Sequence, residues 1–172
     1  DGAYVAYPFR DLLGILALES QRNQCLVVGE DLGTVPDALR AALAAAGVLG
    51  CRLLLFEHDA DGRFKPPADY PAQALAAVGT HDLPTLRGYW LGRALRLREE
   101  LGLFPSPTAR EQAVAERARQ RAWLLAALEH ERLLPDGTGI DPQGVPDVGP
   151  ELGLAVHRFL ARTPCRLLAM QA

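Results

Sequence analysis

Four polar side chains in this sequence have the types and positions that acid–base chemistry requires. Glu30 and Asp31 close one apolar run, and His81 and Asp82 close another. Desolvating a charge at the end of a buried strand costs free energy, so a charged residue placed there indicates a functional role. We pair Glu30 with Asp82, because both close apolar strands and would face one pocket.

Paired carboxyl groups are the groups that glycoside cleavage uses. One carboxylic acid protonates the leaving oxygen, and other carboxylates stabilise the oxocarbenium-like centre. A glutamate in a partly apolar cleft is favoured in its neutral form, which suits a general acid near neutral pH. The pattern therefore predicts this chemistry for Glu30 and Asp82, although a strand-terminal glutamate is about as often a structural or solvated residue.

The elements that must position these residues alternate between strands and helices. Apolar runs that predict strands cover residues 25–30, 51–57, 76–82 and 165–171. They are nearly continuously apolar, as expected for parallel strands covered on both faces. Helical patterns cover residues 7–24, 34–47, 106–134 and 149–164, the third with a capping-box pattern of Thr108 and Glu111. This alternation predicts a parallel α/β fold.

Two architectures compete for this alternation. A doubly wound sheet usually has a G-x-G-x-x-G turn after its first strand, and the turn at residues 29–33 departs from it. A (β/α)8 barrel places functional groups at the carboxyl ends of its strands, and all four runs end in Glu, Asp or Gln. We therefore expect residues 1–172 to form one parallel (β/α) half-barrel, roughly strands five to eight of a TIM barrel, with a helical insertion at about residues 86–150.

Composition argues against several other classes of protein. The 172 residues are 49% hydrophobic, which suits one domain or half of a larger one, and the net charge of −3 argues against a nucleic-acid partner. No apolar run approaches the ~18 residues that span a membrane. Three cysteines without C-x-x-C spacing predict no disulfide framework or zinc site and favour a reduced, cytoplasmic setting. We expect no metal and no cofactor, and the first residue, Asp1, looks like a cut edge.

Three motifs carry a resemblance to a known family. YPFRDLLGILALES (residues 7–20), CLVVGEDLGTVP (25–36) and GTHDLPTLRGYW (79–90) are similar to the core motifs of amylomaltase, the 4-α-glucanotransferase of the α-amylase clan. CRLLLFEHD (51–59) resembles that family's next strand. The likeness runs from about residue 3 to residue 171. It implies a maltooligosaccharide or other α-1,4-glucan substrate, and transfer of a glucan segment by retaining double displacement.

The resemblance also assigns roles to single residues. Glu30 matches the acid/base of the family, and Asp82 matches the carboxylate that grips the sugar hydroxyls and stabilises the transition state. His81 resembles the histidine that hydrogen-bonds the same sugar. The further substrate-binding candidates are Asp31, Phe56 and Tyr7. Phe56 offers a flat apolar face to a sugar ring, whereas Tyr7 is about as well explained by packing under the barrel rim.

The family's nucleophile has no counterpart in this sequence. It is an aspartate at the end of an earlier barrel strand, in an R-I-D-H-like motif that the 172 residues do not contain. A retaining displacement needs that covalent carboxylate, so we expect little or no turnover from this chain alone. An α-amylase-type hydrolase is a second enzymatic interpretation. A catalytically inert half-barrel with binding or structural behaviour is the alternative from another class.

A half-barrel would also leave sheet edges and an apolar face without partners. Such surfaces favour association, and two copies would together supply eight strands, so we predict self-association. Trp90 and Trp123 could stack on sugars, but we expect them to pack, because large aromatic side chains are mostly buried. The arginine-rich residues 117–121 are predicted to form a solvated, salt-bridged face.

Overall fold

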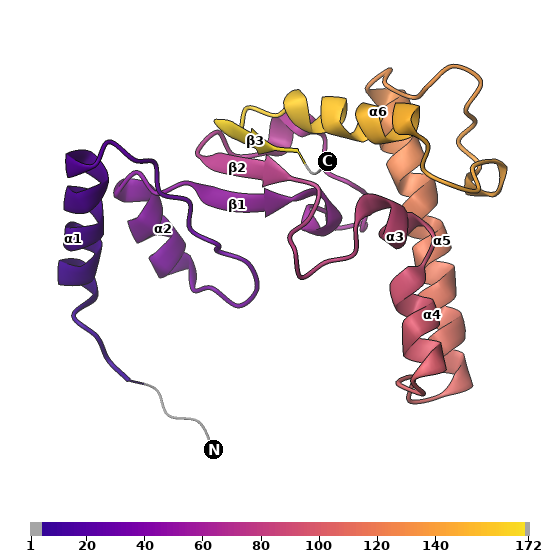
Figure 1. Ribbon diagram of the computed structural model, residues 1–172, viewed down its shortest axis with the longest axis horizontal. Coiled ribbons are helices and arrows are strands. Elements are labelled where there is room, and N and C mark those ends of the chain that lie inside the picture. Colours follow the sequence, from indigo (N-terminus) through magenta and orange to yellow (C-terminus); the bar gives the residue numbers. More distant parts are fainter. Residues whose placement is uncertain (1–4, 171–172) are drawn as a thin grey trace.

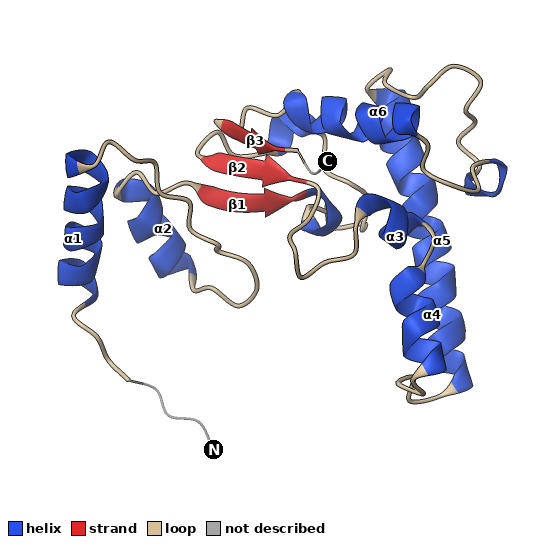
Figure 2. Cartoon of the chain, viewed as in Figure 1, coloured by secondary structure: helices blue, strands red, loops and turns tan. Residues whose placement is uncertain are grey.

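A small parallel β-sheet lies at the centre of the computed structural model, which describes residues 5–170. Its strands are β1 (Gly50–Leu53), β2 (Ala74–Ala77) and β3 (Leu167–Ala169). They lie in the order β1-β2-β3, and both neighbouring pairs are parallel. Figure 2 shows the three arrows side by side and pointing the same way. The predicted parallel α/β class is therefore confirmed.

Six α-helices accompany the sheet within the described residues. They are α1 (Phe9–Arg22), α2 (Asp37–Ala45), α3 (Leu86–Trp90), α4 (Arg93–Glu100), α5 (Pro107–His130) and α6 (Pro150–Ala161). Figure 1 shows α1 and α2 beyond the amino ends of the strands, and α4 running beside α5 away from the sheet. We call α4 and the adjoining half of α5 the helical arm. No helix in residues 5–170 combines the length and the apolar character that crossing a membrane requires.

The cap of α5 differs from the predicted capping box. Ser106 is the N-cap, and its Oγ accepts the backbone N–H of Ala109 at 3.1 Å. Pro107 occupies the first helical position, where its missing N–H costs no hydrogen bond. The helix therefore begins before Thr108, and the prediction of Thr108 as the cap is wrong.

The first predicted strand, residues 25–30, is reduced to a single bridge. Val28 and Leu49 form an isolated parallel bridge, and no regular strand is present there. The ladder stops because the next amide of β1, Cys51 N–H, donates to the side chain of Asp31 at 2.8 Å instead of to a backbone carbonyl. The prediction of four strands is therefore wrong for this sheet, which has three strands and one bridge beside them.

The other predicted strands are shorter or shifted. The run 51–57 leaves the sheet after Leu53 and continues as a 3-10 turn, Leu54–Phe56, whose two leucines are buried. The run 76–82 is a strand over 74–77, and the run 165–171 is a strand over 167–169, with Gln171 outside the described residues. A continuous apolar run reports burial, and burial alone does not set the ends of a strand.

Two hydrophobic clusters cover the two faces of the sheet. Cys51, Leu53 and Ala77 form the smaller cluster on one face. Successive side chains of a strand point to opposite faces, so Ala76 belongs to the other face. There it joins the larger cluster, which α5 and α6 build with Leu124, Leu125, Leu128, Val156, Phe159 and Leu160. The helices thus cover one face of the sheet, as in a β/α layer.

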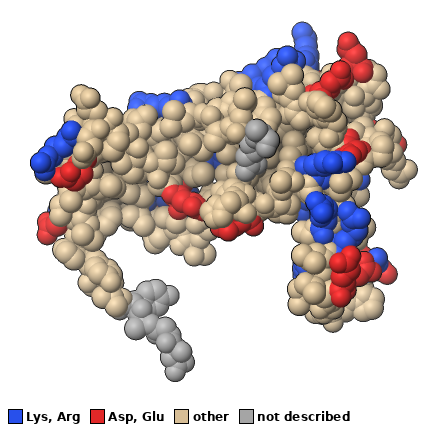
Figure 3. Space-filling model, viewed as in Figure 1, with Lys and Arg blue, Asp and Glu red and all other residues tan. Residues whose placement is uncertain are grey.

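Arginines of α5 pack against aromatic rings where the helix crosses α3. The guanidinium of Arg117 lies 3.6 Å from the centroid of the Tyr89 ring, and that of Arg121 lies 4.5 Å from the Trp90 ring. Both arginines are half-buried, so the predicted solvated face is wrong for them. Arg119 keeps an exposed ion pair at 3.0 Å. Figure 3 shows basic and acidic side chains near one another on the helical arm.

Truncating the core side of α5 should destabilise the fold far more than truncating the arm. Leu128 is fully buried, so Leu128→Ala should lower the free energy of unfolding by about 2–5 kcal/mol, through lost transfer energy and a residual cavity. Leu97 on α4 is 55% exposed. The matched Leu97→Ala should therefore change the free energy of unfolding by less than about 0.5 kcal/mol. Urea unfolding followed by circular dichroism measures both, and equal losses would contradict the packing described.

Candidate active site

The turn between β2 and α3 carries His81 and Asp82. Thr80 closes this turn: its carbonyl accepts Leu83 N–H at 3.1 Å, and its Oγ1 accepts Asp82 N–H at 3.3 Å. His81 Nε2 lies 3.3 Å from Asp82 Oδ1, and the two side chains are 85% and 76% exposed. The structure therefore brings these two predicted residues together in a tight turn and leaves both side chains open to a ligand.

Helix α3 anchors the far side of that turn. Thr85 caps α3 with its Oγ1, and Arg87 Nε donates to Asp147 Oδ1 at 2.8 Å. The Arg87 hydrogen bond lowers the pKa of the Asp147 carboxyl. Trp90 Nε1 donates to the carbonyl of Val145 at 2.9 Å. Side chains just beyond the His81–Asp82 turn thus tie it to the loop before α6.

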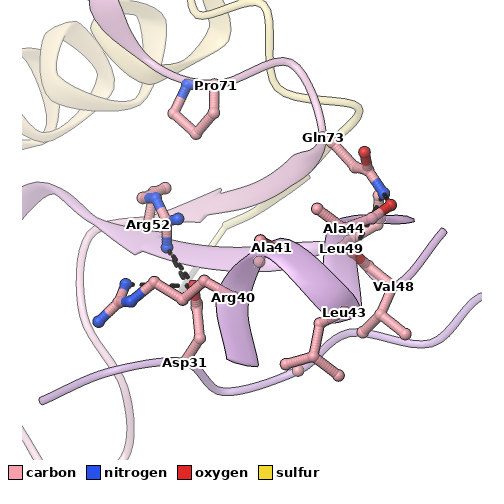
Figure 4. A pocket seen from close by; sticks show the side chains of 12 residues that line it. Asp31, Arg40, Ala41, Leu43, Ala44, Val48, Leu49, Arg52, Pro71 and Gln73 are labelled. Carbon is pink, nitrogen blue, oxygen red and sulfur yellow. Dashed lines mark hydrogen bonds and ion pairs between the residues drawn. The ribbon is translucent and has the colours of Figure 1, made fainter. Parts of the chain in front are cut away.

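Asp31 is the one charged side chain that is buried among residues 5–170, with 7% exposure. Oδ1 accepts hydrogen bonds from Cys51 N–H at 2.8 Å and from Arg52 Nη1 at 2.9 Å. Oδ2 accepts from Arg40 Nη1 at 3.3 Å. Figure 4 shows Arg40 and Arg52 converging on Asp31 from α2 and β1. A buried carboxylate needs such partners, because its desolvation is otherwise uncompensated.

The neighbouring hydrogen-bond donors and arginines stabilise the negative charge of Asp31. Burial by itself raises the pKa of Asp31, but the hydrogen bonds from Cys51 and Arg52 and the charges of Arg52 and Arg40 outweigh it. The net effect lowers the pKa below its ordinary value of 3.8. Asp31 is therefore an ionised anchor near neutral pH.

The ion pairs continue from Asp31 toward the carboxyl end of β1. Arg52 Nε also lies 3.8 Å from Glu57 Oε1, and Lys65 Nζ lies 2.7 Å from Glu57 Oε2. Charges therefore alternate from α2 through Asp31 and Arg52 to the turn after β1. The two arginines are functional candidates that the sequence patterns did not single out. Arg52 could have been found, because it interrupts the otherwise apolar run 51–56.

A glycine at the start of β1 makes room for this ion pair. A Cβ on Gly50 would lie 3.2 Å from Asp31 Oδ2 and 3.2 Å from Arg52 Nη2. Those distances are closer than side chains normally tolerate, so a larger residue would push the two charged groups apart. The absence of a side chain at Gly50 is thus part of the anchor.

Glu30 lies between two fixed points of the backbone. On one side, Gly29 N–H donates to Leu49 O at 2.8 Å, and on the other side Asp31 is held by its ion pairs. The Glu30 side chain itself is exposed, with no hydrogen bond or ion pair to any residue of the range 5–170. The apolar cleft expected around it is not formed by these residues. Its pairing with Asp82 across one pocket stays a prediction.

Phe56 and Tyr7 are exposed side chains at separate places in the fold. Phe56 ends the 3-10 turn after β1 and is 53% exposed, and Tyr7 precedes α1 and is 71% exposed. Phe56 lies beyond the carboxyl end of a strand, as His81 and Asp82 do. Neither ring makes a side-chain hydrogen bond or a ring contact within the described part of the chain. Their roles as sugar-subsite residues stay predictions.

Residues 5–170 contain no group of three or more His, Cys, Asp or Glu side chains that could hold a metal ion. The candidate residues are carboxylates and a histidine, on the turn after β2 and on the segment after the Val28–Leu49 bridge. These groups can exchange protons and accept hydrogen bonds from hydroxyl groups.

Comparison with known proteins gives a consistent family match. The model of glycoside hydrolase family 77, described as 4-alpha-glucanotransferase, matches residues 1–172. A crystal structure of amylomaltase from Corynebacterium glutamicum superposes with a TM-score of 0.82 at 33% identity, over 97% of this chain and 24% of that one.

Sequence relatives carry the same description. A 4-alpha-glucanotransferase of Haemophilus influenzae is 38% identical over 171 residues, which are 99% of this chain and 24% of the relative. One of Mycobacterium bovis is 43% identical over 173 residues, which are 98% of this chain and 23% of the relative. The chain thus spans about a quarter of the length of the relatives that it matches.

Removing the charge of Asp31 should cost stability in a pH-dependent way. Asp31→Asn should lower the free energy of unfolding by roughly 2 kcal/mol at pH 7, because Arg52 loses its 2.9 Å charged partner and keeps only Glu57 at 3.8 Å. The folded pKa lies below 3.8, so the stabilisation is fully present above that value and is lost as the pH falls through the folded pKa. Urea unfolding between pH 7 and pH 3 measures the difference in free energy of unfolding between the wild type and Asp31→Asn. This difference should shrink toward pH 3. Asp61→Asn, at an exposed position, is the control, and a difference that does not vary with pH would contradict the assignment.

Proposed function

Because the chain belongs to the 4-alpha-glucanotransferase family, glycoside hydrolase family 77, we propose that the protein transfers α-1,4-glucan segments between maltooligosaccharides. This chain would supply the acid/base part of the active site. The observation that carries the proposal is the position of two motifs: GEDLGTVP comes after the bridge beside β1, and GTHDLPT comes after β2, within a family match over residues 1–172. The carboxyl ends of parallel strands lie at one edge of a sheet, and barrel enzymes build their sites from the turns at that edge.

The proposed roles divide among three side chains. Glu30 protonates the glycosidic oxygen of the donor and then removes the proton from the acceptor hydroxyl. Asp82 accepts hydrogen bonds from the sugar hydroxyls beside the reacting carbon and stabilises the positive charge of the transition state. His81, 3.3 Å from Asp82, hydrogen-bonds the same sugar. Phe56 and Tyr7 complete the proposed substrate-binding set. The sequence predicts Asp31 in this set as well, but its buried carboxylate is held by two arginines and a backbone amide, so its proposed role is to fix the backbone beside Glu30.

The reaction would proceed by double displacement with a covalent glycosyl-enzyme intermediate. A carboxylate nucleophile attacks the anomeric carbon while Glu30 gives its proton to the leaving sugar, and the acceptor hydroxyl later displaces the nucleophile. The R-I-D-H-like motif of the family's nucleophile is not among the 172 residues. The nucleophile therefore has to come from outside this sequence. Transfer exceeds hydrolysis when a sugar fills the acceptor site better than water does.

The ion-pair network supports the proposed role of Glu30. A general acid must be held in place while its carboxyl group stays free to meet the substrate. Asp31 fixes the backbone next to Glu30 through Cys51, Arg52 and Arg40. The Glu30 side chain has no competing hydrogen bond within residues 5–170.

We further propose that the sheet corresponds to strands five to eight of a (β/α)8 barrel. The bridge at Val28, together with β1, β2 and β3, supplies four consecutive parallel positions in support. Residues 1–172 would then form one partial barrel domain with a helical insertion at about 86–150, where α3 to α5 lie. A reducing, cytoplasmic location is proposed as well, since all three cysteines are unpaired.

A chimaera tests the transferase proposal. Residues 1–172 replace the matching 24% of the Haemophilus influenzae relative, and glucose release from maltotriose is measured. The chimaera should produce glucose and longer maltodextrins, while residues 1–172 alone should not. Glu30→Gln in the chimaera should lower the rate about 1,000-fold, because the proton donor is lost. Glu111→Gln, exposed on α5, is the control, and an undiminished rate for Glu30→Gln would refute its role.

An exposed apolar face on α1 supports the proposed self-association of the isolated chain. Leu12, Ile15 and Leu18 are 49%, 58% and 54% exposed, and no residue of α1 is buried. Sedimentation velocity on residues 1–172 should show a dimer whose fraction grows with concentration. The double variant Leu12→Ser with Ile15→Ser should shift it to monomer, whereas Val114→Ser on the arm should not. A monomer at every concentration would contradict the proposal.

A further inference from the structure

A cavity lies between the turn after β1 and the carboxyl-terminal half of α5. Its volume is about 460 Å³, within the range of about 300–1,000 Å³ that small-molecule sites occupy. Asp59, Arg63 and Phe64 line it from the turn, and Trp123, His130 and Glu131 line it from α5 and its end. None of the residues proposed for the transfer reaction contributes to its wall.

Aromatic side chains form part of the cavity wall. Phe64 is 5% exposed, and Trp123 is half-buried. The edge of the Trp123 ring abuts Gly62, where a Cβ would lie 3.0 Å from the ring. The backbone of Gly62 has φ +83°, so the turn needs glycine there for its conformation as well as for this contact. A side chain at residue 62 would therefore collide with the indole of Trp123.

Polar groups of both signs surround this aromatic wall. Asp59 Oδ1 accepts the N–H groups of Asp61 and Arg63, each at 2.9 Å, and so fixes the turn. The side chains of Arg63 and His130 form no hydrogen bond or ion pair within residues 5–170. Glu131 pairs with an arginine at 3.0 Å through one carboxylate oxygen. The cavity therefore offers both donors and acceptors, with little net charge.

We propose that this cavity is an accessory binding site for an α-1,4-glucan chain. A glucose ring has an apolar C–H face that packs on an aromatic ring, and hydroxyls that both donate and accept hydrogen bonds. The uncharged ligand matches a rim whose charges nearly balance, whereas a strongly anionic or cationic ligand would not. The choice of ligand class rests on the proposed function. The site would hold a long glucan by a segment that is not reacting.

The two tryptophans allow a direct test on residues 1–172. The sequence has two tryptophans, Trp90 and Trp123, so the ¹⁵N-labelled protein gives two indole N–H signals that Trp123→Phe assigns. Trp90 is 1% exposed and does not line this cavity, so it serves as the internal control. Maltohexaose should shift the Trp123 signal in a saturable way and leave the Trp90 signal unchanged. No saturable shift of Trp123 would overturn the accessory site.

Surface variants refine the test without touching the core. Arg63→Ala should weaken the affinity that the Trp123 signal reports about tenfold, since it removes a hydrogen-bond donor from the rim. Arg10→Ala, exposed on α1, should leave that affinity unchanged. An equal affinity in wild type and Arg63→Ala would overturn the assignment, as would an equal response to β-linked cellohexaose.

The same titration separates this site from the transfer site. Signals of His81 report the strand-end site, and the double variant Glu30→Gln with Asp82→Asn should leave the Trp123 shift intact. If His81 responds and Trp123 does not, the accessory site is overturned while the proposed function stands. If Trp123 responds and His81 does not, the accessory site stands and the proposed function loses its support.

Discussion

The buried ion pair between Asp31 and Arg52 is the interaction on which the candidate site depends. A carboxylate with 7% exposure is stable in the fold because two arginines and one backbone amide share its charge. The same contacts join α2, β1 and the segment before α2. Losing Asp31 would leave Arg52 with only the longer, 3.8 Å contact to Glu57.

This anchor also explains why the apolar run before Glu30 is not a regular strand. The Asp31 carboxylate takes the Cys51 N–H that a fourth strand would otherwise have bonded. The chain then turns, and Glu30 projects outward between two fixed residues. The ladder thus loses the backbone hydrogen bond of Cys51 N–H, and the exposed carboxyl group of Glu30 is held at a fixed position. Irregular strand ends of this kind are common beside functional sites.

The second motif is supported by different contacts. His81 and Asp82 lie on a turn that Thr80 closes, and α3 behind it is bound to the loop before α6 through Arg87. Arg121, in turn, donates to the carbonyl of Val145 at 2.8 Å while its guanidinium packs against Trp90. The long helical segment therefore braces the turn that bears the proposed sugar-binding pair, as well as projecting from the sheet.

The sequence by itself determined the parallel α/β class, most helices and the two motifs, because apolar periodicity and local motif spacing depend on residues close in the chain. It also placed Glu30, His81 and Asp82 after apolar segments. Only the tertiary structure decided where the strands end, since a buried 3-10 turn and a buried strand have equally apolar sequences. Only it decided that Asp31 is a paired, buried anchor and that Arg121 packs on an aromatic ring. Those partners lie more than twenty residues away in the chain, at Arg52 and Trp90, and no local pattern encodes which distant charge or ring a side chain will meet.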